Sequence, residues 1–84
     1  MVDWRRVIFS DFEDDEEIRE KLHAHGLQLE EVVQCFYNPF QVKKNKTFGD
    51  RYQLIGRTDA GRKLKIIFQL RFGNVVRIIT GWDV

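Results

Sequence analysis

Apolar positions in the first half of the chain repeat with the period of a helix. Their i, i+3, i+4, i+7 spacing predicts a helix over Leu27–Phe36 with one buried stripe. That stripe consists of Leu29, Val32, Val33 and Phe36. A preceding helix is expected from about Glu13 to Ala24, because acidic residues favour a helix N-terminus and Gly26 favours an end. It has few apolar positions, so we expect most of its surface to be exposed.

The second half of the chain changes to the period-2 alternation that is typical of strands. Strands are expected at residues 40–45, 51–58, 62–71 and 74–82, and a short β-branched run predicts an earlier one at Arg6–Ser10. The resulting order is β-α-α-β-β-β-β. It predicts an α+β fold in which two helices pack on one face of a mostly antiparallel sheet.

The same alternation divides the strand residues between the two faces of the sheet. The face assigned to the helices comprises Tyr52, Leu54, Gly56, Leu64, Ile66, Phe68, Leu70, Val76, Ile78, Thr80 and Trp82. The opposite face carries a set of cations: Arg51, Arg57, Lys63, Lys65, Arg71 and Arg77. Guanidinium groups bind phosphate bidentately, so this face predicts a phosphate-bearing ligand with Arg77 at its centre. The alternative is an ordinary solvent-facing sheet surface.

Length and charge leave both alternatives open. The 84 residues predict one domain over 1–84, with a net charge of +1. Residues 1–31 carry 10 acidic and 4 basic side chains, whereas residues 32–84 carry 3 acidic and 10 basic ones. The basic half favours an anionic partner. Equally, the two halves could neutralise each other within one fold.

Several classes of protein and site are disfavoured. No apolar run approaches the roughly 18 residues of a membrane span, and the charged start lacks the apolar stretch of a signal peptide. We therefore expect a cytoplasmic protein without membrane contact. The lone Cys35 excludes an internal disulfide and a multi-cysteine zinc site, and its apolar surroundings predict a core position. No cofactor motif is present, and His23 and His25 are spaced so that a helix would point them apart, so no metal site is expected.

An ordered series of short motifs resembles the BrnT-type toxin family. The segment 22–32 is similar to that family's "KHGxSxEEA", 36–39 to "VFxDP", 50–56 to "ERxxxIG", 61–64 to "GRxLxVV" and 77–80 to "RIIS". The spacing holds over about residues 6–80. The arginine that usually follows the last motif is absent, because the chain continues with Gly81 and Trp82.

The resemblance implies a RelE-like fold and a type II toxin, a metal-independent endoribonuclease held by an antitoxin protein. The catalytic candidates are His25, Arg51 and Arg77, with His25 as base or acid and the arginines stabilising the crowded phosphate. Further substrate-binding candidates are Arg57, Arg62, Lys63, Lys65 and Arg71. The alternative is a non-catalytic RNA- or protein-binding module of the same fold. Besides RNA and an antitoxin, a second copy of the chain is a candidate partner, which would give a homodimer. His25 could instead cap its helix, and Trp82 could pack in the core or stack on a base.

Overall fold

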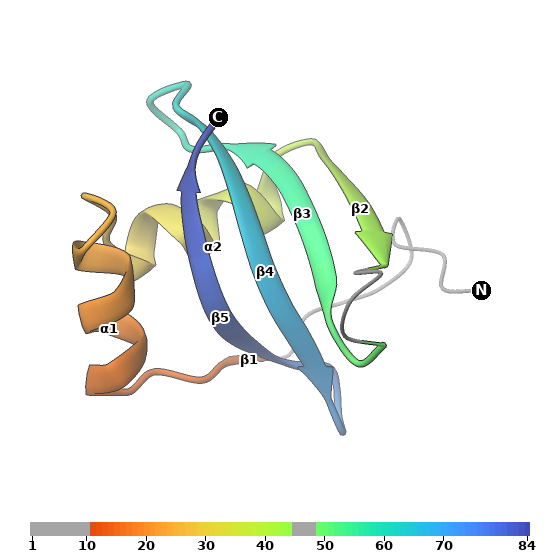
Figure 1. Cartoon of the computed structure of the whole chain (residues 1–84). Coiled ribbons are helices and arrows are strands. Elements are labelled where there is room, and N and C mark those ends of the chain that lie inside the picture. The colour runs from red at the N-terminus through yellow and green to blue at the C-terminus, as the bar shows by residue number, and fades with distance from the viewer. Residues whose placement is uncertain (1–10, 45–48) are drawn as a thin grey trace.

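Two helices lie on one side of a curved sheet of five strands in residues 11–44 and 49–84, the part of the chain that the computed structural model describes (Figure 1). In chain order the elements are β1 (Asp11–Phe12), α1 (Glu16–His23), α2 (Leu29–Tyr37), β2 (Phe40–Lys44), β3 (Tyr52–Arg57), β4 (Lys63–Arg71) and β5 (Val75–Asp83). The strand expected at residues 6–10 lies outside the described residues. None of the described helices is long and apolar enough to cross a membrane.

The first helix is shorter than its sequence pattern predicts, and its caps explain why. Asp15 is the N-cap, and its carboxylate accepts a hydrogen bond of 2.9 Å from the backbone N–H of Ile18. Glu13 lies before the helix and continues the pairing with β5, because its backbone N–H donates to the Val76 carbonyl at 2.8 Å. Gly26 ends the helical turn with φ of 72°, a left-handed conformation that favours glycine.

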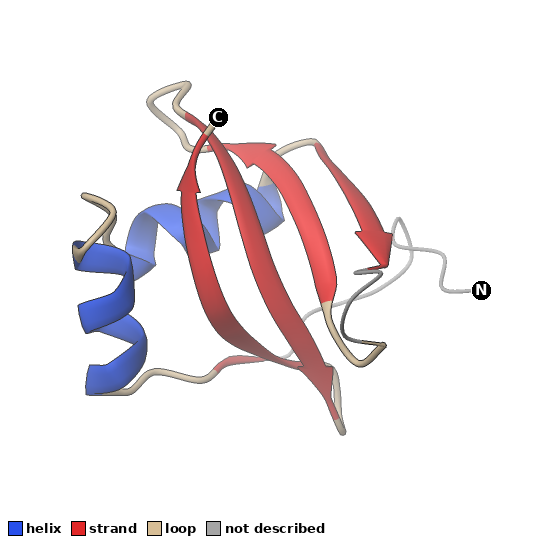
Figure 2. Ribbon diagram, viewed as in Figure 1, coloured by secondary structure: helices blue, strands red, loops and turns tan. Residues whose placement is uncertain are grey.

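The sheet has the order β1-β5-β4-β3-β2, and all neighbours are antiparallel except the short β1–β5 pair. The strands are red and the helices blue in Figure 2. Their arrangement confirms the predicted α+β class and the mostly antiparallel sheet. Gly61 in the β3–β4 turn has φ of 88°, a left-handed conformation that favours glycine. The β4–β5 turn uses two positive φ values, 78° at Gly73 and 61° at Asn74, which suit a tight hairpin.

The core fills the space between the helices and one face of the sheet. Its fully buried members include Leu22, Val32, Cys35, Leu54, Leu64, Ile66, Phe68, Val76 and Ile78. Cys35 thus occupies the expected core position, where burial raises the pKa of its thiol to about 11. Gly56 on β3 lets α2 approach closely, because a Cβ there would lie only 3.1 Å from the carbonyl oxygen of Cys35.

A β-bulge interrupts the pairing of β4 with β5. Ile67 pairs with Thr80, whereas the next residue, Phe68, pairs with Ile78. The register therefore skips Ile79. One extra residue in a strand reverses its alternation from that point onward, so the side chains beyond it exchange faces.

The prediction that Thr80 and Trp82 face the helices was therefore wrong. Gly81 turns toward the core instead, where an added Cβ would lie 3.6 Å from a methyl carbon of Leu22. Trp82 pairs with Lys65, whose side chain lies on the face away from the helices. A glycine inside a strand pattern is a known sign of a bulge or a close backbone approach, and Gly81 was that sign.

Candidate nucleic-acid interface

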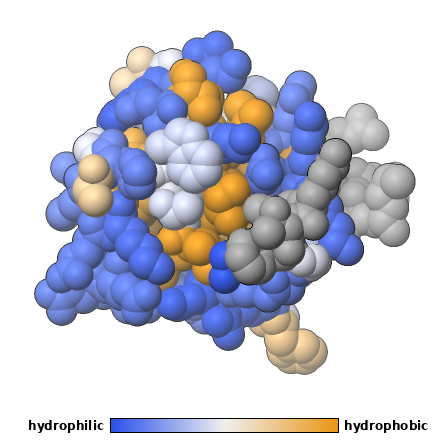
Figure 3. Space-filling model, in the orientation of Figure 1, coloured by the Kyte–Doolittle hydropathy of each residue, from blue (hydrophilic) through white to orange (hydrophobic). Residues whose placement is uncertain are grey.

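The sheet face opposite the helices is called the open face here. Strand pairing and alternation place on it Gln41, Lys43, Gln53, Ile55, Arg57, Lys63, Lys65, Ile67, Gln69, Arg71, Val75, Arg77, Thr80 and Trp82. Viewed directly, it shows an apolar strip surrounded by hydrophilic side chains (Figure 3). Five of its six cations are ones that the sequence places there, Arg57, Lys63, Lys65, Arg71 and Arg77, and the sixth is Lys43 on β2. These cations differ sharply in their partners.

At the end of the open face where β4 ends and β5 begins, the cations are paired within the molecule. The guanidinium of Arg77 lies 3.0 Å from Glu13 and 3.2 Å from Asp15, measured from Nη1 to the carboxylate oxygens. Arg71 lies 3.3 Å from the other oxygen of Glu13. Hydrogen bonds to Glu13 and then Asp15 raise the pKa of Arg77, whose side chain is only 25% exposed. The charges at this end are therefore neutralised within the fold, and this pairing explains how an arginine is accommodated near the start of β5.

Arg62, a predicted RNA contact, is held by two carboxylates and a carbonyl. Its Nε and Nη2 donate to the carboxylate of Asp83 at 2.5 and 2.6 Å. Its Nη1 donates to the Gly26 carbonyl at 3.1 Å and to Glu31 at 3.2 Å. The bidentate hydrogen bond from Arg62 lowers the pKa of Asp83. Arg62 thus connects the turn between the helices to the end of β5, and its Nε, Nη1 and Nη2 groups all donate to partners within the protein.

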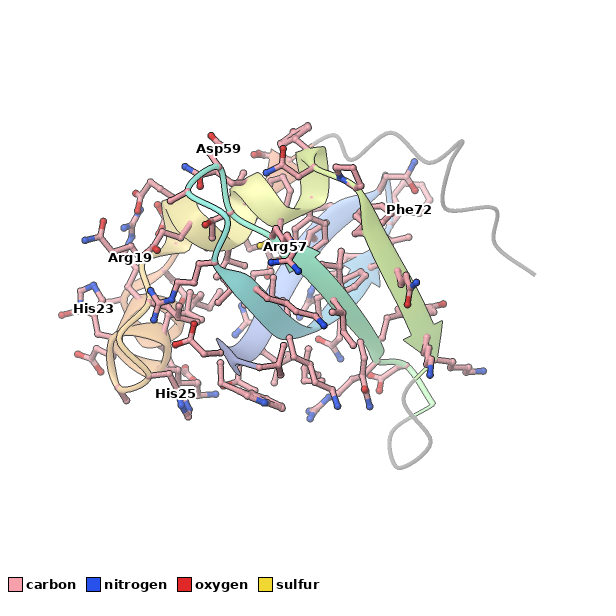
Figure 4. The ribbon with its side chains drawn as sticks, turned by 90° about the horizontal axis from the view of Figure 1, so that it is seen from above. Arg19, His23, His25, Arg57, Asp59 and Phe72 are labelled. Carbon is pink, nitrogen blue, oxygen red and sulfur yellow. The ribbon has the colours of Figure 1, made fainter. Side chains whose placement is uncertain are left out.

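At the other end of the open face, the cations lack such partners. Within residues 11–44 and 49–84, no carboxylate lies within salt-bridge distance of Arg57, Lys63 or Lys65. Arg57 donates only to the Gly61 carbonyl, at 3.1 Å, and is exposed at the end of β3 (Figure 4). Lys63 is paired directly with Arg57 across the two strands, so their charges stand side by side.

An aromatic side chain completes this end of the sheet. The ammonium of Lys65 lies 5.9 Å from the ring centroid of Trp82, within cation–π range. The exposed His25 ring lies 6.4 Å from the same tryptophan, measured between centroids, on the side of the sheet opposite α2 (Figure 4). We call Arg57, Lys63, Lys65, Trp82 and His25 the cationic–aromatic patch. Basic groups beside an aromatic face are the chemistry of single-strand recognition.

The predicted catalytic residues are not gathered at one point. His25 lies beside Trp82, whereas Arg77 is five positions earlier on β5, about 16 Å away along the strand at ~3.3 Å per residue. Arg51 precedes β3 and so lies toward the Arg77 end of the sheet. Only His25 of the three therefore belongs to the cationic–aromatic patch.

Metal-binding clusters and relatives were the two other possible sources of information on a ligand. Within residues 11–44 and 49–84, no group of three or more histidine, cysteine, aspartate or glutamate side chains could hold a metal ion. Comparison of the sequence with protein-family models and with curated proteins finds no match. The choice of ligand therefore depends on the chemistry of the cationic–aromatic patch.

Proposed function

We propose that this protein binds single-stranded RNA through the cationic–aromatic patch. The observation that carries the proposal is the contact of Lys65 with Trp82 on the open face, beside the unneutralised Arg57 and Lys63. A base can stack on the indole while the cations contact the backbone phosphates. The motif resemblance to RNA-cleaving toxins favours RNA over DNA as the natural ligand.

The placement of the cations supports this ligand over a duplex. Lys63 and Lys65 lie two positions apart on one strand, and Arg57 lies beside Lys63, so these three charges lie together at one corner of the open face. A duplex presents its bases stacked and inaccessible to an indole face, whereas a single strand can place one on Trp82. We therefore expect weak binding of double-stranded RNA and tighter binding of a single strand.

The test is the fluorescence anisotropy of a labelled ten-nucleotide RNA titrated with protein in EDTA. Replacing Trp82 by Ala should weaken binding by about 1–3 kcal/mol, which is roughly 5- to 150-fold, because one stacked base is lost. Trp82→Phe keeps an aromatic face and should remain within a few-fold of the wild type. Lys21→Ala removes one cation from α1, where it pairs with Glu17 at 3.3 Å, and serves as the charge control.

Two results would contradict the proposal. The first is equal affinity for RNA of the wild type and Trp82→Ala, both folded by circular dichroism. The second is an equal loss of affinity in Lys21→Ala and Lys65→Ala, since that would mean that net charge alone attracts the RNA.

We infer a second candidate activity, endoribonuclease action of the toxin type, from the position of His25. Its imidazole lies beside Trp82 on the surface where RNA would lie, and an imidazole can take a proton from a 2′-hydroxyl or return one. In this arrangement Lys63 and Lys65, rather than Arg77, would stabilise the phosphate in the transition state. An antitoxin protein that covers the patch would be the expected partner.

Cleavage is tested with the same RNA in EDTA, by separating the products on a denaturing gel. Cutting by the wild type that His25→Gln abolishes, while RNA affinity is retained, would support the nuclease. An intact strand at saturating wild-type protein would leave the binding module as the function. Cutting that persists in His25→Gln would remove this residue from the mechanism.

A further inference from the structure

A hollow of about 460 Å³ lies on the open face next to the cationic–aromatic patch. It is lined by Pro39, Phe40, Gln41, Ile55, Gly56, Arg57 and Lys63. Two of these residues, Arg57 and Lys63, are also members of the patch, so the hollow and the patch share their charged border. A volume of this size falls within the range of pockets that hold small ligands.

The lining of the hollow combines three kinds of chemistry. Pro39 and Ile55 give it apolar walls, and the side-chain amide of Gln41 offers both a donor and an acceptor. Arg57 and Lys63 place positive charge at its border. A nucleobase matches these features in turn, because it has a flat face, a hydrogen-bonding edge and an attached phosphate.

Strand pairing connects the hollow to Trp82 in one straight row. Gln41 pairs with Ile55, Ile55 with Lys65, and Lys65 with Trp82. Ile55 and Trp82 are therefore two strand spacings apart, about 10 Å at ~4.8 Å per spacing. Lys65 lies between them on the same face. A strand crossing the sheet along this row would place one base at each end and a phosphate near the lysine.

We propose that the hollow binds a second base of the RNA whose first base stacks on Trp82. This proposal rests on the proposed function, and it adds that the protein engages at least two nucleotides, with Gln41 contacting the edge of the second. The positive border and the apolar walls together favour a base with its phosphate over an uncharged apolar ligand.

A pair of substitutions on β3 separates filling of the hollow from a change in charge. Ile55→Arg adds a cation and places a long side chain in the hollow. Gln53→Arg adds the same charge on the same face and strand, outside the lining. Electrostatics alone would tighten RNA binding in both variants. If the hollow holds a base, Ile55→Arg should bind the labelled RNA about tenfold more weakly than Gln53→Arg.

The outcomes distinguish the two proposals. Equal affinities of Ile55→Arg and Gln53→Arg, together with weakened binding by Trp82→Ala, would overturn the second base site alone. Absence of RNA binding by the wild type would overturn both proposals. Should Ile55→Arg fail to fold, Gln41→Ala decides, since it truncates an exposed residue on the edge strand. A several-fold loss of affinity supports the site, and an unchanged affinity overturns it.

Discussion

The salt dependence of RNA binding offers a quantitative test of which cations meet the phosphates. Binding to a single strand releases about 0.7 counterion per neutralised phosphate, so the slope of log K against log salt reports the number of contacts. Besides Lys43 on β2, three cations of the open face lack carboxylate partners in the described part of the chain, and these three belong to the cationic–aromatic patch: Arg57, Lys63 and Lys65. With one phosphate each, the expected slope is about −2.

This slope predicts a definite loss of affinity between two buffers. Raising the salt from roughly 50 to roughly 200 mM should weaken the wild type about 18-fold. Lys63→Ala should reduce the slope to about −1.4 and the loss to about sevenfold. Arg71→Ala removes the same charge from the other end of the same strand, but Arg71 already pairs with Glu13. We therefore expect it to leave the slope unchanged.

The assay is an anisotropy titration of the labelled RNA at several salt concentrations for the wild type and both variants. Glu13 keeps its contact with Arg77 in Arg71→Ala, so the fold is not expected to change. The reasoning fails if Arg71→Ala flattens the slope as much as Lys63→Ala does. That result would mean that the internal ion pairs do not withhold cations from RNA.

Three further predictions concern the framework of the site. Gly56→Ala should lower the free energy of unfolding in urea by about 1–3 kcal/mol, because the new methyl would crowd the Cys35 carbonyl at 3.1 Å; Gly81→Ala, whose nearest contact is 3.3 Å, should cost less. Its hydrogen bonds with Arg62 lower the pKa of Asp83, so the contribution of this pair to stability is present at pH 7 and is lost as the pH falls through the lowered pKa. In thermal unfolding, Asp83→Asn should therefore be less stable than the wild type at pH 7 and equally stable near pH 2. A difference that stays constant with pH would refute this. The buried thiol of Cys35, with a pKa of about 11, should react with a thiol reagent at pH 8 slowly in the native protein and at once in urea, and fast native labelling would count against its burial.

The sequence alone determined the parts of the fold that depend on local pattern. The helical period placed α2 within two residues of its observed bounds, and strand alternation located β2 to β5 with similar precision. Gly26 marked the end of the first helix because few other residues tolerate positive φ. These features depend on residues close together in the chain, whose preferences can be read directly.

Only the tertiary structure decided which cations remain available and where Trp82 points. Arg71 and Arg77 meet Glu13 because β1 runs beside β5, a contact across more than 55 residues that no spacing rule reveals. The bulge at Ile79 turned Trp82 to the open face, since strand register is fixed by pairing with β4 rather than by β5 itself. The candidate site therefore lies at the opposite end of β5 from the arginine that the sequence placed at its centre, because charge pairing and register are properties of the folded chain.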